Sequence, residues 1–252
     1  MIEAINPATE EVVGQYEPHD AQAIDARLAA AERAFEQWRY TSQADRAALL
    51  GNVAGLLRQR KRDYADLMTA EMGKPIAQAV AEAEKCAWVC EHYAEHGPSY
   101  VAPQEIETEA RRSLVRFDPL GPVLAIMPWN FPFWQVFRFA APALVAGNVG
   151  LLKHAANVPG CALAIESVFR DAGAPQGAFA SLLIDAQTAD ELIGRPTIRA
   201  VTLTGSERAG VAVARTAGAH LKKCVLELGG SDPFVVLADT DLDLAVDRKS
   251  VV

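Results

Sequence analysis

Cysteine and basic residues are both scarce in this sequence. Four cysteines among 252 residues are too few for a disulfide-stabilised scaffold, so we expect a reducing compartment, the cytoplasm. Asp and Glu number 32 against 24 Lys and Arg, which gives a net charge of -8. The densest basic stretch, Arg58, Arg60, Lys61 and Arg62, is interpreted as the solvated face of a helix. This charge balance disfavours a nucleic-acid-binding protein.

Unbroken apolar runs are also missing. The residues between Asp118 and Arg138 are uncharged, but four prolines interrupt them, so we expect no membrane span. The N-terminal residues include Glu10 and Glu11 and show no basic stretch followed by an apolar one. No signal peptide is therefore expected.

The sequence shows no convergent set of metal ligands. Cys86 and Cys90 share one helical face, whereas His92 and His96 point away from it at about 100° per residue. We therefore expect no metal site, and we interpret these cysteines as core residues.

The first hundred residues are predicted to be helical, because apolar side chains recur at spacings of three and four. The first helix follows Asp20 and the second begins near Ser42, both suitable N-cap residues. The third covers residues 63–72 and is ended by Gly73. The fourth is expected to end at Gly97-Pro98.

Polar and apolar residues alternate over a short range in residues 105–117. This pattern predicts one or two exposed strands, closed by a turn at residues 118–121. Such strands need a partner edge, and a neighbouring subunit is one candidate.

After Gly121, short apolar runs alternate with helical segments such as residues 161–172 and 207–217. This order predicts an α/β fold with a doubly wound parallel, Rossmann-like sheet. We expect an N-terminal helical segment over residues 1–120 and the sheet domain over residues 121–246. The predicted strands are residues 123–127, 149–152, 179–184, 200–203, 224–228 and 234–237.

The first predicted strand runs into Met127, Pro128, Trp129 and Asn130. The carboxyl ends of parallel strands are where such sheets bind ligands. Prolines on both sides fix the backbone around Asn130, and a rigid side-chain NH2 group is a suitable oxyanion donor. A proline-rich turn with a structural asparagine remains the alternative.

Two further strand ends carry candidate binding residues. Lys153 is able to reach a ribose hydroxyl or a phosphate, although most surface lysines are only solvated. Thr204, Gly205 and Ser206 form a strand-to-helix turn, and helix N-termini attract phosphate. The turn is neither a GxGxxG fingerprint nor a P-loop, and simple N-capping by Ser206 is the alternative.

Glu227 lies between two leucines at the end of a predicted strand. We expect partial desolvation to raise the pKa of this carboxyl toward the range of a general base. A carboxylate held by the two following backbone amides is the alternative.

Taken together, four motifs resemble the aldehyde dehydrogenase superfamily over residues 6–246. Residues 151–155 and 222–234 are most similar to bacterial succinate-semialdehyde dehydrogenases. The motifs are Pro128-Trp129-Asn130-Phe131-Pro132, Gly147-Asn148 followed by Lys153, Thr204-Gly205-Ser206, and Glu227-Leu228-Gly229-Gly230.

The resemblance implies an NAD- or NADP-dependent oxidation of an aldehyde through a cysteine thioester. By resemblance, Asn130 donates to the oxyanion and Glu227 activates the water that hydrolyses the thioester. Lys153 holds the adenosine ribose and Ser206 the pyrophosphate. The other implied cofactor-site residues are Met127, Pro128, Trp129, Ala156, Thr204, Gly205 and Leu228.

Two positions bear on specificity. NAD-selective relatives often carry a glutamate three residues after the lysine, and Ala156 here leaves NADP admissible. Arg138 resembles the arginine that binds the distal carboxylate of succinate semialdehyde, and an Arg fork suits a carboxylate. An ion pair on a helix is the alternative for Arg138. The family resemblance also implies a homodimer or homotetramer.

The family's nucleophilic cysteine lies beyond the Glu227 motif, in a catalytic domain that these residues do not include. Cys224 precedes Glu227 by three residues and is expected on the opposite strand face. We therefore expect cofactor binding without turnover. Residues 247–252 match the translation of a common short-read sequencing adapter, which predicts that they are not native and that the natural protein is longer. A short non-catalytic dinucleotide-binding protein, or an interaction protein, remains possible on the residues alone.

Overall fold

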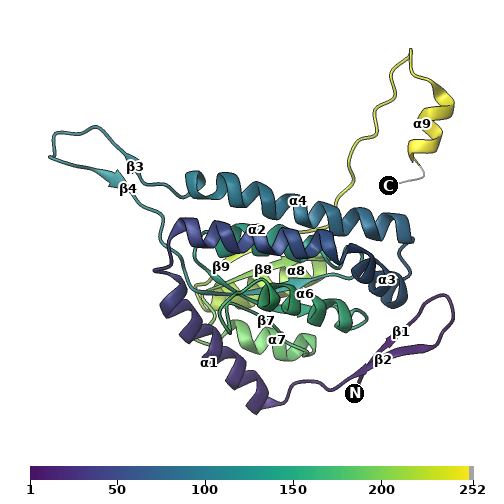
Figure 1. Ribbon diagram of the computed structural model, residues 1–252, viewed down its shortest axis with the longest axis horizontal. Coiled ribbons are helices and arrows are strands. Elements are labelled where there is room, and N and C mark those ends of the chain that lie inside the picture. The colour runs from purple at the N-terminus through teal and green to yellow at the C-terminus, as the bar shows by residue number, and fades with distance from the viewer. Residues whose placement is uncertain (250–252) are drawn as a thin grey trace.

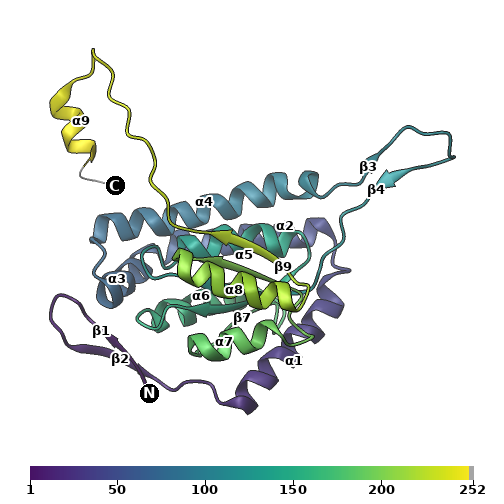
Figure 2. The same ribbon diagram turned by 180° about the vertical axis from the view of Figure 1, so that it is seen from behind.

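The computed structural model describes residues 1–249, with side chains through Val246 (Figures 1 and 2). Two antiparallel hairpins and a set of helices precede and flank a parallel sheet. The elements are β1 (Ile2–Ile5), β2 (Val12–Tyr16), α1 (Ala21–Trp38), α2 (Gln43–Gln59), α3 (Lys61–Met72), α4 (Ile76–Tyr100), β3 (Gln104–Glu105), β4 (Leu114–Val115), β5 (Pro122–Met127), α5 (Trp134–Val145), β6 (Val149–His154), α6 (Pro159–Asp171), β7 (Phe179–Ser181), α7 (Ala186–Ile193), β8 (Ala200–Thr204), α8 (Glu207–Ala219), β9 (Lys223–Glu227) and α9 (Leu242–Lys249).

Within residues 1–249 the main sheet has five parallel strands in the order β7-β6-β5-β8-β9. The chain first builds outward from β5 to β7 and then returns to β8 on the other side of β5. Figures 1 and 2 show α6 on one face of the sheet and α8 on the opposite face, as the usual right-handed crossovers require. The strand order therefore reverses between β5 and β8, which confirms the predicted doubly wound sheet.

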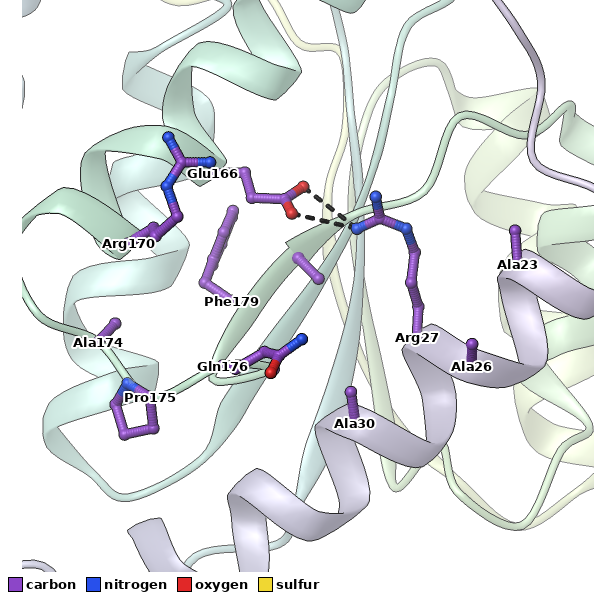
Figure 3. Close-up of a pocket in the computed structure, with 12 residues that line it drawn as sticks. Ala23, Ala26, Arg27, Ala30, Glu166, Arg170, Ala174, Pro175, Gln176 and Phe179 are labelled. Carbon is purple, nitrogen blue, oxygen red and sulfur yellow. Dashed lines mark hydrogen bonds and ion pairs between the residues drawn. The ribbon is translucent and has the colours of Figure 1, made fainter.

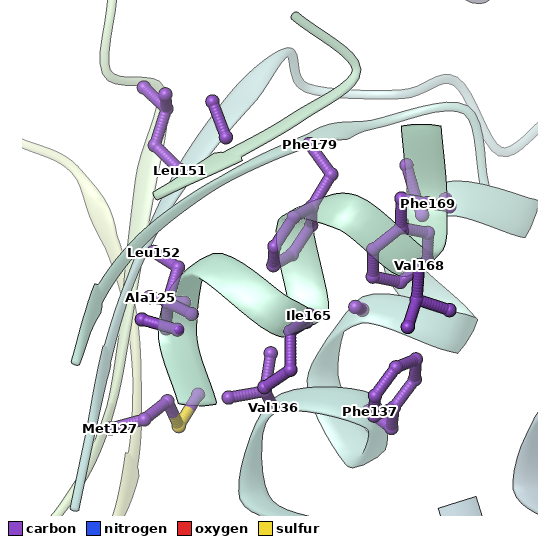
Figure 4. Packing of buried hydrophobic residues seen from close by; sticks show 14 of the residues in the cluster. Ala125, Met127, Val136, Phe137, Leu151, Leu152, Ile165, Val168, Phe169 and Phe179 are labelled. Carbon is purple, nitrogen blue, oxygen red and sulfur yellow. The ribbon is translucent and has the colours of Figure 1, made fainter. Parts of the chain in front are cut away.

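The hydrophobic core is continuous between the sheet and the N-terminal helices. The rings of Phe137 in α5, Phe169 in α6 and Phe179 in β7 lie next to one another, with successive centroids 5.3 and 4.5 Å apart (Figure 4). Helices α2 and α4 pack against α5, and α2 and α3 pack against α6. Among the described residues, no helix has both the length and the apolar character needed to cross a membrane.

The helix-start predictions are confirmed. The Asp20 carboxylate accepts from the backbone N–H of Ala23 at 2.8 Å, and the Ser42 hydroxyl accepts from Asp45 N–H at 3.1 Å. Gly73 ends α3 with φ +77°, in the left-handed region that glycine adopts without strain.

Two expectations about the N-terminal residues were wrong. Residues 2–16 form the β1–β2 hairpin, although the first hundred residues were predicted to be helical. Helix α4 continues past Pro98 to Tyr100, because a proline in the last turn removes only one hydrogen bond near the helix end. The basic cluster that begins at Arg58 is solvated as expected, although it spans the junction of α2 and α3, and its members form ion pairs with Glu91, Asp171, Glu84 and Asp66.

Two predicted strands also differ from the structure. β7 ends at Ser181, earlier than predicted, because it pairs with β6 over three residues only. Residues 234–237 are not a strand, and their side chains are 44–75% exposed. Apolar residues form a strand only where a neighbouring edge completes their hydrogen bonds, and among the described residues none lies beside them.

Candidate functional site

The carboxyl ends of β5, β8 and β9 meet at one edge of the sheet, beside the point where the strand order reverses. They enclose a pocket of about 390 Å³. Most of the predicted site residues contribute to it. Its lining consists of Pro128, Trp129, Asn130, Gln135, Thr204, Gly205, Ser206, Glu227, Leu228 and Gly229.

Asn130 lies in the turn between β5 and α5, and its side chain is exposed toward this pocket. Its Oδ1 accepts from the backbone N–H of Phe131 at 3.1 Å. The side-chain oxygen is therefore used locally, which leaves the NH2 group as the donor that faces the pocket.

His154, at the end of β6, holds the turn between β5 and α5 in place through hydrogen bonds. Its ring is 5% exposed. The backbone N–H of Ala155 donates to Nδ1 at 2.9 Å, so Nε2 carries the proton and donates to the carbonyl of Pro132 at 2.8 Å. Burial lowers the pKa of His154 to about 4, which keeps the ring neutral at physiological pH.

The turn after β8 opens α8 onto the same pocket. The Ser206 hydroxyl accepts from the backbone N–H of Ala209 at 3.3 Å, so the expected N-cap is present. Gly205 lies in open surroundings, since a Cβ there would meet only Leu203, at 3.6 Å. Its N–H donates to the carbonyl of Glu227 at 3.0 Å, which ties the ends of β8 and β9 together.

Glu227 and Arg138 face each other across the site. Arg138 Nη1 lies 3.6 Å from Glu227 Oε2, and Nη2 donates to Thr204 Oγ1 at 3.2 Å. The side chain of Glu227 is 55% exposed. The expected desolvation of this carboxyl was therefore wrong, because β9 is an edge strand with alternating exposure. The ion pair joins α5 to β9 and is not confined to one helix.

A second pocket of about 460 Å³ adjoins the first and shares Gln135, Thr204 and Glu227 with it. Met127 and Arg138 line this second pocket. Sequence reasoning missed Gln135, whose Oε1 is buried without a hydrogen-bond partner among the described residues. Gln135 lies three residues before Arg138, so both side chains are on one face of α5. This spacing is the sequence signal from which Gln135 could have been predicted.

Lys153 is the last residue but one of β6, and Ala156 lies two residues beyond the end of the strand. Neither side chain lines the two pockets. Burial lowers the pKa of Lys153, and the nearby Asp185 carboxylate partly opposes that shift. Asp185 caps α7 by accepting from Thr188 N–H at 2.7 Å. Residue 156 is an exposed alanine. The side chain at this position therefore places no carboxylate near Lys153.

A model of the aldehyde dehydrogenase family matches residues 1–250 of the chain. The chain belongs to this family. A protein of Synechocystis sp. named as a probable succinate-semialdehyde dehydrogenase acting with NADP(+) is 53% identical over 245 residues, which are 97% of this chain and 54% of that protein. The Escherichia coli succinate semialdehyde dehydrogenase Sad, named as acting with NAD(P)+, is 50% identical over 96% of this chain and 53% of its own length.

Solved structures give the same result. A crystal structure of succinic semialdehyde dehydrogenase from Streptococcus pyogenes in complex with NADP+ has a TM-score of 0.92 and 35% identity, and the match covers 96% of this chain and 54% of that one. The chain thus spans about half the length of the aldehyde dehydrogenases that it matches.

The cysteines of this aldehyde dehydrogenase chain, all in its described part, are free. Cys86, Cys90 and Cys161 are fully buried, and burial raises the pKa of each thiol. Cys224 packs against the core, whereas Glu227 on the same strand lines the pockets, so the predicted opposite orientation is confirmed. These surroundings disfavour a reactive thiolate at any of the four.

Another cavity, of about 620 Å³, lies elsewhere in this aldehyde dehydrogenase chain (Figure 3). It lies between α1, α6 and β7, and the Arg27–Glu166 ion pair, with Nη1 and Oε1 3.1 Å apart, crosses it. Phe179 at the start of β7 forms part of its wall. The cavity is therefore near the amino end of that strand, away from the predicted site residues.

Proposed function

We propose that the chain is the cofactor-binding half of an aldehyde dehydrogenase that oxidises succinate semialdehyde to its carboxylic acid with NAD or NADP. One observation carries the proposal. Asn130, Ser206 and Glu227, which lie far apart in sequence, line one pocket at the carboxyl edge of the sheet, where doubly wound folds bind dinucleotides.

The residues present fit a dinucleotide. The first turn of α8 opens onto the pocket beside Gly205, which leaves space for a phosphate. In our proposal Ser206 binds the pyrophosphate and Lys153 the adenosine ribose. Met127, Pro128, Trp129, Thr204 and Leu228 line the remaining path. Ala156 adds no charge that would repel a 2′-phosphate, and the names of the two curated relatives include NADP(+) and NAD(P)+.

The bound cofactor supplies a hydride acceptor. The chain's own residues supply polar groups around the aldehyde. The NH2 group of Asn130 is proposed to donate to the oxyanion that forms when a thiolate adds to the carbonyl. Glu227 is proposed to accept a proton from the water that releases the acid.

Arg138 is proposed to bind the distal carboxylate of the substrate. Its guanidinium is 37% exposed and lines the pocket next to Gln135, and a planar fork of donors matches a carboxylate. Its present partners, Glu227 and Thr204, lie beside the proposed reaction centre. A substrate carboxylate would compete with Glu227 for this guanidinium.

We propose that the chain by itself binds cofactor without turnover, because no cysteine in it lies at the pocket. Division into residues 1–120 and 121–246, with a non-native tail over residues 247–252, also stays a proposal. The tail begins within α9 and includes residues 250–252, which lie outside the described residues. The free thiols accord with a cytoplasmic location, and the exposed hairpin β3–β4 is a candidate for pairing in a homodimer or homotetramer.

Cofactor binding is tested by titrating the chain with NADPH and NADH and following nicotinamide fluorescence. We expect saturable binding that Lys153→Ala weakens roughly tenfold, because one charge-assisted contact is lost. Lys61→Ala is the matched control, since Lys61 pairs with Glu84 and lines neither pocket at the site, and it should bind as the parent does. The absence of saturable binding would reject the proposal, as would turnover of succinate semialdehyde by this chain alone.

The substrate assignment is tested in the complete enzyme with Arg138→Ala. We expect KM for succinate semialdehyde to rise roughly a hundredfold, which corresponds to loss of a bidentate charged contact, while KM for an uncharged aldehyde changes little. Equal changes for both substrates would exclude a carboxylate-binding role for Arg138.

A further inference from the structure

A buried ion pair lies beneath the turn that carries Asn130. The side chains of Lys74 and Glu82 are 6% and 2% exposed, and Lys74 Nζ contacts Glu82 Oε2. Neither residue lines the two pockets at the site. Burying two charges is costly unless each has further well-placed partners, so those partners indicate what the pair does.

The partners of Glu82 are the first backbone amides of α5. Its Oε1 accepts from the N–H groups of Phe133 and Trp134, both at 2.9 Å. Helix α5 has no side-chain cap of its own. A carboxylate at a helix N-terminus satisfies free N–H groups and interacts favourably with the helix dipole. Glu82, which comes from α4, therefore fixes where α5 begins.

The partner of Lys74, apart from Glu82, is the ring of Phe131. Its Nζ lies 3.7 Å from the ring centroid, within the range of a cation–π contact. Phe131 directly follows Asn130 in the chain. The ion pair therefore holds the residue after Asn130 and the helix start beyond it, while His154 holds the intervening carbonyl of Pro132.

We propose that Lys74 and Glu82 are positioning residues for Asn130, which set the direction of its side-chain NH2 group through Phe131 and the first turn of α5. The proposal rests on the role of Asn130 given above. The positioning role is tested separately from cofactor binding, because it concerns the geometry of the turn whether or not cofactor is bound.

The chain offers a matched control in Glu71. This residue is also buried: counted over the whole residue, Glu71 is 2% exposed and Glu82 is 4% exposed. It likewise accepts from two amides at a helix start, Gly160 N–H at 2.7 Å and Cys161 N–H at 2.9 Å. Its helix is α6, which does not carry Asn130. Replacing Glu71 therefore removes the same kind of cap without touching the Asn130 turn.

The test is fluorine NMR of the 252-residue chain labelled with fluorotryptophan, without cofactor. Trp129 adjoins Asn130 and reports on the turn, and Trp38 in α1 serves as the internal reference. The test variant combines Lys74→Met and Glu82→Gln, which removes both charges with little change in shape. We expect its Trp129 signal to shift or broaden while the Trp38 signal stays in place. In Glu71→Gln both signals should stay in place, and Lys74→Arg, which keeps the charge, should retain the parent Trp129 signal.

NADPH titration of the same variants adds a functional measurement. We expect affinity to fall about threefold to tenfold in the double variant, because Trp129 and Asn130 line the cofactor pocket, and to change less than about twofold in Glu71→Gln.

An unchanged Trp129 signal in the folded double variant overturns the positioning role. If that variant does not unfold cooperatively, Glu82→Gln alone replaces it, and an unchanged Trp129 signal there has the same meaning. Failure of the parent chain to bind NADPH would instead reject the proposed function, because the Trp129 comparison needs no cofactor.

Discussion

His154 shows how a single buried residue controls the geometry of the site. Its Nδ1 accepts from Ala155 N–H and its Nε2 donates to the Pro132 carbonyl. A protonated ring carries hydrogen on both nitrogens, so protonation would remove the acceptor that Ala155 needs. Burial opposes that change and lowers the pKa to about 4.

Replacing His154 by Gln is expected to change how stability depends on pH. The pKa is 6.5 in the unfolded chain and about 4 in the folded one, so the unfolded state binds more protons between these values. The stabilisation is therefore present above pH 6.5 and is lost as the pH falls toward 4. From about pH 7 to about pH 4.5, the parent should lose about 2 kcal/mol more free energy of unfolding than His154→Gln. Urea unfolding at both pH values measures this, and an equal loss in the two proteins would contradict it.

The sequence predicted the residues of the pocket better than the residues that support them. Asn130, Ser206 and Glu227 were predictable because each lies at or just after the end of a strand of one parallel sheet, and such strands end at a common edge. Glu82 and His154 were not, because their partners are backbone groups on elements brought close only by tertiary packing. The environment of Glu227 was mistaken for a similar reason. Strand order decides whether a strand is central or at an edge, and a single strand does not reveal it.

At the scale of elements, the packing of α1 beside the β7 strand depends on a close approach at Gly177. Its φ is +92°, and a Cβ there would lie 2.4 Å from the carbonyl oxygen of Ala30 in α1. Gly173 is a natural comparison, since its φ is +97° and a Cβ there would meet nothing within 4 Å.

Gly177→Ala is therefore expected to destabilise the chain by about 3 kcal/mol or more, because backbone strain and a clash with a rigid helix add together. Gly173→Ala should cost about 1 kcal/mol, from backbone conformation alone. Urea unfolding at neutral pH measures both. Equal losses of free energy of unfolding in the two variants would mean that the close contact between Gly177 and α1 does not affect stability.

Helices were more predictable than isolated strands. The periodicity of α1 and α2 extends over many turns, and Asp20 and Ser42 mark their starts. The strands β1 and β2 span four and five residues, too few for a clear alternation. Residues 234–237 are apolar yet lie outside any strand, because strand formation requires a partner edge that the pattern of one segment does not specify.

At the scale of the whole molecule, the two parts separated by the predicted boundary at residue 120 share their buried polar groups. Glu71 and Glu82 lie before the boundary and cap α6 and α5 beyond it. Trp38 also crosses it, since its Nε1 donates to the Leu144 carbonyl at 3.0 Å. The N-terminal helices therefore contribute to the same folding unit as the sheet.

We expect residues 121–252, produced without residues 1–120, to show no cooperative unfolding transition. The first amides of α5 and α6 would lose their carboxylate partners, and the apolar face of α5 that α4 covers would meet water. Thermal unfolding followed by circular dichroism, with the 252-residue chain as reference, measures this. A sharp transition in the shorter chain would show that the sheet folds independently.

The same carboxylates affect the order of events during synthesis. Helices α3 and α4 leave the ribosome before residues 133–161 have been translated, so Glu71 and Glu82 emerge without the amides that they bind in the finished structure. A buried carboxylate without partners is unfavourable, and water is its best available environment at that stage. We therefore expect the carboxylates of Glu71 and Glu82 to stay hydrated until α5 and α6 appear. Their burial thus follows translation of the turn that contains Asn130 and of the two helices that come after it.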